Sequence, residues 1–429
     1  MLLSFIEVAA LSRFARQQLA LALVLGGAGP AFAEDAVVAV GLPRPVKDPC
    51  SKSARPGEWV KLPDGGPAAP ARPGPMSATF DGRRFVIGNQ QKAAVLDSCG
   101  ETWAAAPAPT GAGVVTDGID LGGARLIPAH DPRRSSYDGF AGARLVLPSG
   151  KEIRTPAAGA PGPRTYHVVA FDGRRLLVWG GYGPAPDGRS HGTFGDGAVF
   201  DTRSRSWRPM APAGAPAARF RPVAVWTGRK LLVWGGGAGA PGREPTQFGD
   251  GAAYDPARDR WTPMSAAGAP PPRWKPVVVW TGKFMVLTGG GDSLTIGGAR
   301  GRNDAYVYDP DADRWAAVEG APKLAEAHWV RTFVDPRGRV LFGDTHVLQN
   351  FGVLDPRARR FEEVTVPETL RERSGMGFAW TGARLLLWGG YRQLPGYVNP
   401  CQNFHGPGGC DPPSPPFAVF ADGWFYAPP

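Results

Sequence analysis

Residues 164–182 read RTYHVVAFDGRRLLVWGGY, and the fold can be inferred from this segment. The pattern returns as RFRPVAVWTGRKLLVWGGG at residues 219–237 and as RWKPVVVWTGKFMVLTGGG at residues 273–291. The three starts lie 55 and 54 residues apart, and each copy has two apolar runs around a DG or TG turn, then a pair of glycines. Apolar runs around such turns predict β-hairpins. The chain is therefore built from a repeated β unit.

A second motif completes each unit after a polar loop. Its copies are GDGAVFDTRSRSW, GDGAAYDPARDRW and NDAYVYDPDADRW, which end at Trp207, Trp261 and Trp315. Both halves together predict four short strands per unit. Further copies occupy residues 77–103, residues 328–361 and the stretch from residue 373 onward, and a degraded copy occupies residues 114–156.

This unit resembles the kelch repeat, whose marks are the Gly-Gly after the second strand, the Tyr or Phe before Asp in the third, and the Trp of the fourth. The resemblance covers residues 77–429 and implies an all-β, kelch-type β-propeller. Seven units in that span are about 50 residues each, whereas six would need about 59. We therefore expect seven four-stranded blades, with six as the alternative. The central domain of galactose oxidase and the sialic-acid mutarotases share this fold.

The first 33 residues have the features of a bacterial export signal. An apolar run at residues 19–27 follows Arg13 and Arg16, and Ala31-Phe32-Ala33 matches a signal-peptidase site. We expect cleavage after Ala33 and a secreted or periplasmic monomer. The run is too short to span a bilayer, so no stable membrane insertion is expected.

Residues 34–76 form an N-terminal extension ahead of the propeller. Within it, GEWVKLP at residues 57–63 resembles a fourth strand without its own blade. A strand of this kind is suited to close the ring or to cover its edge.

Composition and motif spacing narrow the function. The net charge is +10, but no basic block or aromatic–basic stripe is present, so nucleic acid is not an expected partner. The 6 His residues show no HxH or HExxH spacing. The stretch Asp309-Pro-Asp311-Ala-Asp313 starts like a calcium loop but lacks its glycine and distal glutamate. We expect no metal and no cofactor.

The first strands of five units begin with a basic residue, on the face that also carries the long loops between second and third strands. These candidate ligand-binding residues are Arg164, Arg219, Arg273, His328 and Arg373. A ring of such side chains would suit an anionic ligand, such as a carboxylated or sulfated sugar. The alternative is structural, because Asp196, Asp250 and Asp304 recur at a matching period and could pair with the arginines.

Export makes the 4 Cys residues candidates for disulfides. Cys99 lies in a turn between third and fourth strands, and Cys50 precedes a fourth-strand-like segment, so both are expected on the short-loop face. Cys401 and Cys410 lie in the long loop of the last unit, on the opposite face. Since bridged Cα atoms must come within about 7 Å, we expect Cys50–Cys99 and Cys401–Cys410.

The sequence therefore predicts a propeller that binds a ligand or an extracellular or envelope protein through its long-loop rim. A carbohydrate-active enzyme of mutarotase or epimerase type is the alternative, although no catalytic motif of that family matches. A galactose-oxidase-like oxidase would need a copper site with a Cys–Tyr crosslink, and no cysteine here is free of a disulfide role. We accordingly name no catalytic residue.

Overall fold

The computed structural model describes residues 36–39, 50, 55–67, 76–80, 83–88, 93–105, 119–122, 124–129, 139–185, 190–239, 245–292, 301–320, 330–344, 351–371, 373–393 and 417–429. All regular structure in these residues is β, as the repeats predicted. None of them forms a helix long and apolar enough to cross a membrane.

Three sheets correspond to the three clearest repeats, and each has four antiparallel strands in chain order. The first contains β11 (His167–Phe171), β12 (Arg175–Trp179), β15 (Gly197–Asp201) and β16 (Ser206–Pro209). The second contains β17 (Val223–Trp226), β18 (Leu231–Trp234), β21 (Gly251–Asp255) and β22 (Arg260–Pro263). The third contains β23 (Val277–Trp280), β24 (Met285–Thr288), β25 (Ala305–Asp309) and β26 (Arg314–Ala317).

Three further sheets come from the weaker copies, including the degraded one. They contain β27 (Val330–Val334), β28 (Val340–Asp344), β29 (Phe351–Asp355) and β30 (Arg360–Glu363); β3 (Ser77–Phe80), β4 (Arg84–Gly88), β5 (Ala93–Asp97) and β6 (Trp103–Ala105); and β7 (Ile119–Asp120), β8 (Arg125–Ala129), β9 (Gly139–Val146) and β10 (Glu152–Arg154). The last sheet combines both ends of the chain, with β31 (Gly377–Trp380), β32 (Leu385–Trp388), β35 (Gly423–Tyr426) and β2 (Trp59–Lys61).

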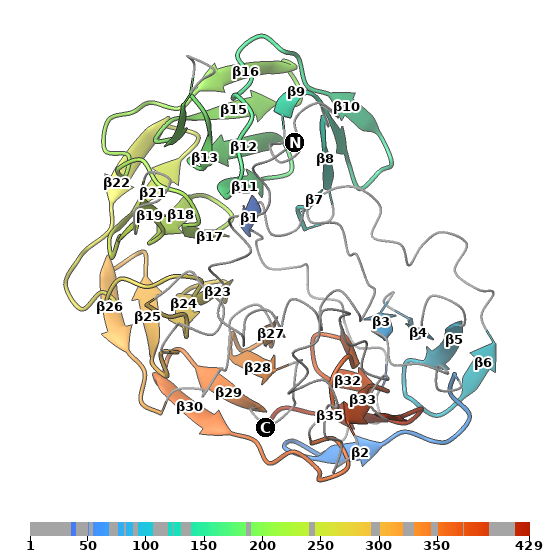
Figure 1. Cartoon of the computed structure of the whole chain (residues 1–429). Coiled ribbons are helices and arrows are strands. Elements are labelled where there is room, and N and C mark those ends of the chain that lie inside the picture. Colours follow the sequence, from blue (N-terminus) through green and yellow to red (C-terminus); the bar gives the residue numbers. More distant parts are fainter. Residues whose placement is uncertain are drawn as a thin grey trace, which may run out of the picture.

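These sheets are arranged around a common axis as the blades of a propeller (Figure 1). First strands such as β11, β17 and β23 lie nearest the axis, and fourth strands such as β16, β22 and β26 lie at the periphery. The predicted all-β propeller architecture is therefore confirmed. The blade number of the complete chain stays a prediction, because segments between the sheets lie outside the described residues.

The DG and TG turns form the tight connections between first and second strands. In one of them, Thr227 Oγ1 accepts the backbone N–H of Lys230 at 2.9 Å. Gly228 has a φ of 89° there, which a residue with a Cβ adopts only at a cost in free energy. Because such short turns require particular residues, these connections can be recognised from sequence.

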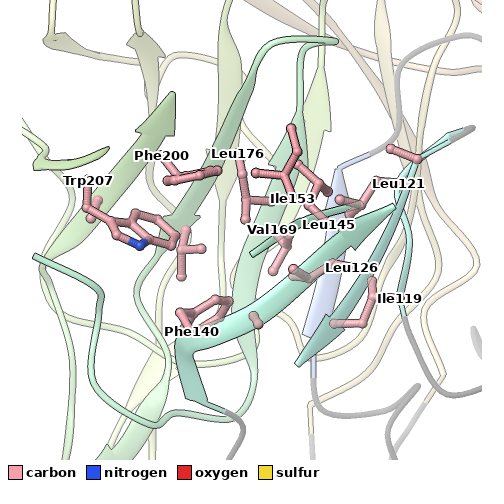
Figure 2. Packing of buried hydrophobic residues seen from close by; sticks show 14 residues of the cluster. Ile119, Leu121, Leu126, Phe140, Leu145, Ile153, Val169, Leu176, Phe200 and Trp207 are labelled. Atoms are coloured by element: carbon pink, nitrogen blue, oxygen red, sulfur yellow. The ribbon is translucent and has the colours of Figure 1, made fainter. Parts of the chain in front are cut away.

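Hydrophobic cores lie between neighbouring sheets rather than within one sheet. Figure 2 shows the core in which Ile119, Leu126 and Phe140 of the degraded copy face Val169 and Phe200 of the next blade. Burial of this kind is the main stabilising term in such a fold.

Fourth-strand tryptophans pack against the preceding blade. The ring of Trp261 lies 5.2 Å from that of Trp179, and Trp315 lies 6.0 Å from Trp234, measured between centroids. Both members of each pair are buried. These tryptophans therefore connect one blade to the next.

The N-terminal extension closes the ring. Strand β2 pairs antiparallel with β35, so that Trp59 lies opposite Tyr426 and Lys61 opposite Trp424. The fourth strand of the last blade thus comes from the beginning of the chain. Sequence alone left ring closure and edge cover open for residues 57–63, and β2 lies within that stretch.

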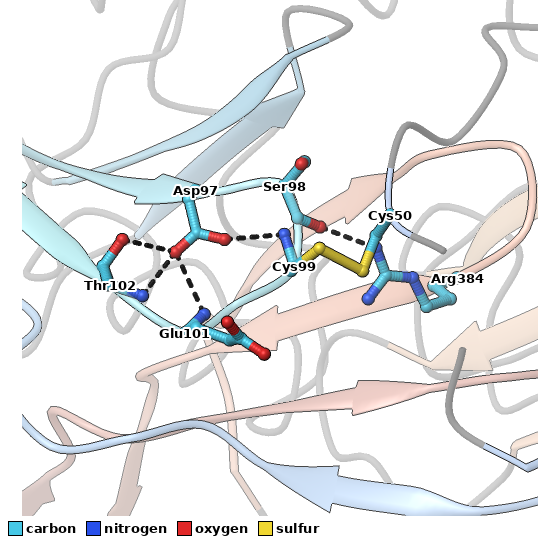
Figure 3. The surroundings of a disulfide bond; sticks show 7 residues. All are labelled: Cys50, Asp97, Ser98, Cys99, Glu101, Thr102 and Arg384. Atoms are coloured by element: carbon cyan, nitrogen blue, oxygen red, sulfur yellow. Dashed lines mark hydrogen bonds between the residues drawn. A yellow bond between two sulfur atoms is a disulfide. The ribbon is translucent and has the colours of Figure 1, made fainter. Parts of the chain in front are cut away.

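A disulfide joins Cys50 to Cys99 beside this closure (Figure 3). Asp97 arranges the turn that carries Cys99, because its carboxylate accepts the backbone N–H groups of Cys99 and Glu101 at 2.8 and 3.1 Å. Arg384 of the last blade donates to the carbonyl of Ser98 at 2.6 Å. The predicted Cys50–Cys99 bridge is thus present. The predicted Cys401–Cys410 bridge lies outside the described residues.

One strand was not expected. Strand β1 (Ala36–Ala39) adds to the inner edge of β11 and makes that blade five-stranded. Figure 1 shows β1 close to the propeller axis, beside β11 and β17. Because β1 precedes the recognisable repeats, periodicity contained no signal for it.

Candidate functional site

The long-loop rim is the face formed by the first-strand starts and the connections between second and third strands. Three of these connections carry two-stranded hairpins, β13 (Tyr182–Pro184) with β14 (His191–Thr193), β19 (Gly237–Ala238) with β20 (Thr246–Gln247), and β33 (Tyr391–Gln393) with β34 (Phe417–Val419). Each is held to its first-strand start by a bridge, such as those of Thr165 with Tyr182 and Phe220 with Gly237. The sequence predicted that the first-strand starts and the long loops share one face, and in the structure the bridges connect them.

The four described arginines of the predicted rim are buried. Their exposed fractions are 2% or less, and these residues are Arg164, Arg219, Arg273 and Arg373. Each pairs with the aspartate that immediately precedes the third strand of its own blade; the partners are Asp196, Asp250, Asp304 and Asp422. His328, the fifth candidate, lies outside the described residues.

The same four guanidinium groups also hold backbone carbonyls. Arg219 Nε donates to the carbonyl of Ala217 at 2.9 Å, and its Nη1 donates to the carbonyl of Gly235, also at 2.9 Å. Equivalent bonds recur in the other three blades. An arginine at this position therefore ties the first-strand start to the glycine pair and to the third strand.

Burial and a neighbouring charge act in opposite directions on the guanidinium group of Arg219. Burial lowers the pKa of Arg219, while the charge and hydrogen bond of Asp250 raise it. The carboxylates are the more exposed partners, since the side chain of Asp196 is 68% exposed and that of Asp250 is 59% exposed. At these positions the surface presents aspartate in front of arginine.

This geometry agrees with the structural alternative for the arginines. Each of these four guanidinium groups has a carboxylate and carbonyls as partners, and an aromatic ring lies against it, as Phe194 does 4.5 Å from Arg164. Binding of an anion by this ring of arginines stays a prediction.

A set of aromatic residues, not singled out from sequence, lies at the same rim. Phe220 stacks on Trp274 with ring centroids 5.6 Å apart, and Tyr182 stacks on His191 at 6.1 Å. Phe220 also lies 6.3 Å from Tyr166 and 5.9 Å from Tyr182. We call these five residues, together with Arg221, the aromatic cluster.

Arg221 differs from the buried rim arginines. Its guanidinium carbon lies 3.8 Å from the ring centroid of Tyr166, and the residue is only partly buried. None of the ion pairs between described residues involves Arg221. Because a guanidinium stacked on a ring keeps its donors at its edge, Arg221 can bind a carboxylate in its plane.

Residues two positions after the rim arginines have a left-handed backbone conformation, which sets the direction of their side chains. Tyr166, Arg221 and Lys275 have φ values of 55°, 51° and 50°, and the equivalent residue of the last blade is Gly375 with a φ of 67°. Glycine adopts this conformation without steric cost, whereas tyrosine, arginine and lysine do not. Such outliers often mark functional positions.

Carboxylates at the turns between third and fourth strands serve structural roles. Asp313 Oδ1 accepts the hydroxyl of Tyr308 at 2.6 Å and the backbone N–H of Ser265, in the preceding blade, at 2.8 Å. Asp309 accepts the N–H of Asp311 at 3.0 Å. Across the described ranges, no group of three or more His, Cys, Asp or Glu residues could hold a metal ion.

The fold and the arginine–aspartate pairs define a β-propeller built from one repeated blade. The KLHDC2/KLHL20/DRC7 Kelch-repeats domain family matches residues 151–343, which contain the three clearest repeats. The chain is a kelch-repeat protein, as its motifs indicated.

Several curated proteins are similar to parts of the chain. An F-box/kelch-repeat protein of Arabidopsis thaliana is 23% identical over 48% of this chain, which is 55% of that protein. The N-(sulfonatooxy)prop-2-enimidothioate sulfolyase of Thlaspi arvense is 22% identical over 58% of this chain and 76% of its own length. Human kelch domain-containing protein 9 is 31% identical over 27% of this chain and 31% of its own. The chain thus spans about half the length of the first of these relatives.

Proposed function

We propose that this chain is an exported, non-catalytic interaction module that binds a partner protein at the long-loop rim. The aromatic cluster with Arg221 supports this proposal. Tyrosine, tryptophan and arginine are the side chains most enriched at binding hot spots, and here they are packed against one another before any partner arrives. Such preorganisation lowers the entropic cost of binding.

The orientation of the rings favours a peptide over a stacked sugar. Arg221 covers a face of Tyr166, Trp274 covers a face of Phe220, and His191 covers a face of Tyr182. One face of each of these three rings is therefore covered, and the cluster offers the guanidinium donors of Arg221. These groups suit a protein segment in which a carboxylate lies next to an apolar side chain.

Kelch repeats imply a protein-interaction scaffold, and the F-box/kelch-repeat relative is consistent with that role. Export is supported by the apolar run at residues 19–27 and the Ala31-Phe32-Ala33 motif. The proposed compartment is the periplasm or the cell exterior. An anionic carbohydrate is the alternative ligand at the same rim.

The test is a binding screen of the purified chain against envelope proteins, extracellular proteins, and acidic and neutral oligosaccharides. The decisive variant is Arg221→Ala, because alanine keeps a Cβ at the same backbone position. Arg229→Ala is the matched control, since Arg229 is exposed in a turn on the opposite face. We expect Arg221→Ala to weaken protein binding by about thirtyfold, equivalent to about 2 kcal/mol, and the control to leave it unchanged.

Other outcomes would replace this proposal. Saturable binding of acidic oligosaccharides alone would establish the carbohydrate alternative. Catalysed anomer interconversion, followed by NMR, would establish an enzyme of mutarotase type. Unchanged protein binding in Arg221→Ala would place the site away from the aromatic cluster.

A further inference from the structure

The pairing of β1 with β11 stands apart from every other strand pairing described. It is parallel, with Ala36 opposite His167 and Ala39 opposite Ala170, whereas the remaining described strand pairs are antiparallel. The blade of β11 already has the four strands of its sister blades without β1. Strand β1 is therefore an addition to a complete blade.

The inner edge of a propeller blade can accept a strand because its outward N–H and C=O groups have no partner within the blade. In the described part of the molecule, β17 and β23 end their sheets on the axis side, while β11 carries β1 there. Strand β1 also lies against β17 and β7, the inner strands of the two neighbouring blades. The acceptor is thus the inner edge of β11, and the inner strands of the two neighbouring blades lie beside it.

The sequence of β1 suits this position. Residues 36–39 read AVVA, a short apolar segment with two β-branched residues, which fit a pleated surface. Four residues make few backbone hydrogen bonds, and these bonds must offset the entropic cost of ordering the segment. Pairing of this length is therefore readily reversible. The Cys50–Cys99 bridge anchors the chain only 11 residues beyond Ala39 and keeps the segment near its acceptor.

We propose that the inner edge of β11 is an acceptor site for an extended apolar strand, and that residues 36–39 are its exchangeable occupant. The backbone donors and acceptors of β11 supply affinity, as in strand addition to other exposed sheet edges. The site is independent of the aromatic cluster, so each proposal can fail without the other.

The test uses the full chain with Val37→Pro and Val38→Pro, which remove two backbone donors from β1. The matched control is Val37→Thr with Val38→Thr, which keeps the donors and the β-branching. The probe is a fluorescein-labelled peptide EDAVVAVG, the sequence of residues 34–41. We expect saturable binding to the proline variant, and binding weaker by about tenfold or more to the unmodified chain and the threonine variant, whose tethered strands compete.

Hydrogen exchange gives a second readout that needs no peptide. The amides of residues 167–170 that face β1 are expected to exchange about tenfold faster in the proline variant than in the unmodified chain, while those of β17 stay unchanged. Equal exchange of these β11 amides in both chains would overturn the proposal, as would a folded proline variant that captures no peptide. If the proline variant does not fold, equal protection of the inner-edge amides of β11 and β23 in the unmodified chain would overturn it.

Discussion

The indole rings of Trp388 and Trp103 pack with their centroids 4.7 Å apart, although the two residues come from opposite ends of the propeller sequence. Trp388 belongs to the second strand of the last blade, and Trp103 to the fourth strand of the first recognisable repeat. The contact reproduces the packing of Trp179 with Trp261 inside the ring. The junction between the chain ends therefore uses the same contact as the junctions between successive repeats.

Truncating this contact should destabilise the ring. We expect Trp388→Ala to lower the free energy of unfolding by about 3–5 kcal/mol, the usual range for deleting a buried tryptophan. Urea unfolding followed by circular dichroism measures this loss. Trp234→Ala is the matched comparison within the ring, and a loss at Trp388 below about 1 kcal/mol would show that closure does not depend on the pair.

Removing the Cys50–Cys99 bridge should also weaken closure. The bridge spans 49 residues, and loop-closure entropy of that size is worth up to about 4 kcal/mol. We expect Cys50→Ser with Cys99→Ser to lose about 2–4 kcal/mol in chemical unfolding. Non-reducing peptide mapping checks the connectivity, and a Cys50–Cys401 peptide would contradict both the structure and the expected Cys401–Cys410 bridge.

Arg219→Ala separates the structural role of the rim arginines from a ligand-binding role. It leaves the carboxylate of Asp250 and the carbonyls of Ala217 and Gly235 without their donor. We expect a loss of about 2–4 kcal/mol, below the range for a fully buried pair because Asp250 is 59% exposed.

The control for this change is Arg229→Ala, which should alter stability by less than about 0.5 kcal/mol because the side chain is exposed. The readout is the free energy of unfolding, alongside the affinity for an acidic oligosaccharide. Unchanged stability in Arg219→Ala together with lost oligosaccharide binding would favour the predicted anion-binding ring.

His167 should make the protein less stable in acid. Its burial, reinforced by the charge of Arg164, lowers its pKa from 6.5 to about 3. Between these values the unfolded chain binds a proton that the folded chain does not. The free energy of unfolding should therefore fall by about 1.4 kcal/mol for each pH unit below 6.5, down to about pH 3.

The matched variant for this prediction is His167→Met, because Met376 occupies the equivalent position in the last blade. Its unfolding free energy, measured against that of the unmodified chain from pH 7 to pH 4, should show a shallower decline. Parallel curves for the two chains would contradict the lowered pKa of His167.

The positions of many candidate-site residues could be predicted from sequence, but the roles of these residues could not. The arginines of the rim could be located because they recur beside the glycine pairs, and their aspartates recur at the same period. Sequence alone left open whether these charges face a ligand or each other, because that depends on the burial of each side chain. Similarly, Phe220 and Trp274 follow equivalent arginines, but their stacking depends on how neighbouring blades meet.

The repeated four-stranded unit, its tight turns and its fourth-strand tryptophans could be recognised from sequence, because local turn chemistry and periodic burial specify them. The Cys50–Cys99 pairing followed instead from the face of the propeller to which the repeat assigns each cysteine. The folded chain was needed to show which side chains the ring buries, which aromatic residues cluster at the rim, and where β1 adds. The reason is geometric. Closing the ring brings together residues from separate repeats and from both chain ends, and no periodicity along the chain encodes those contacts.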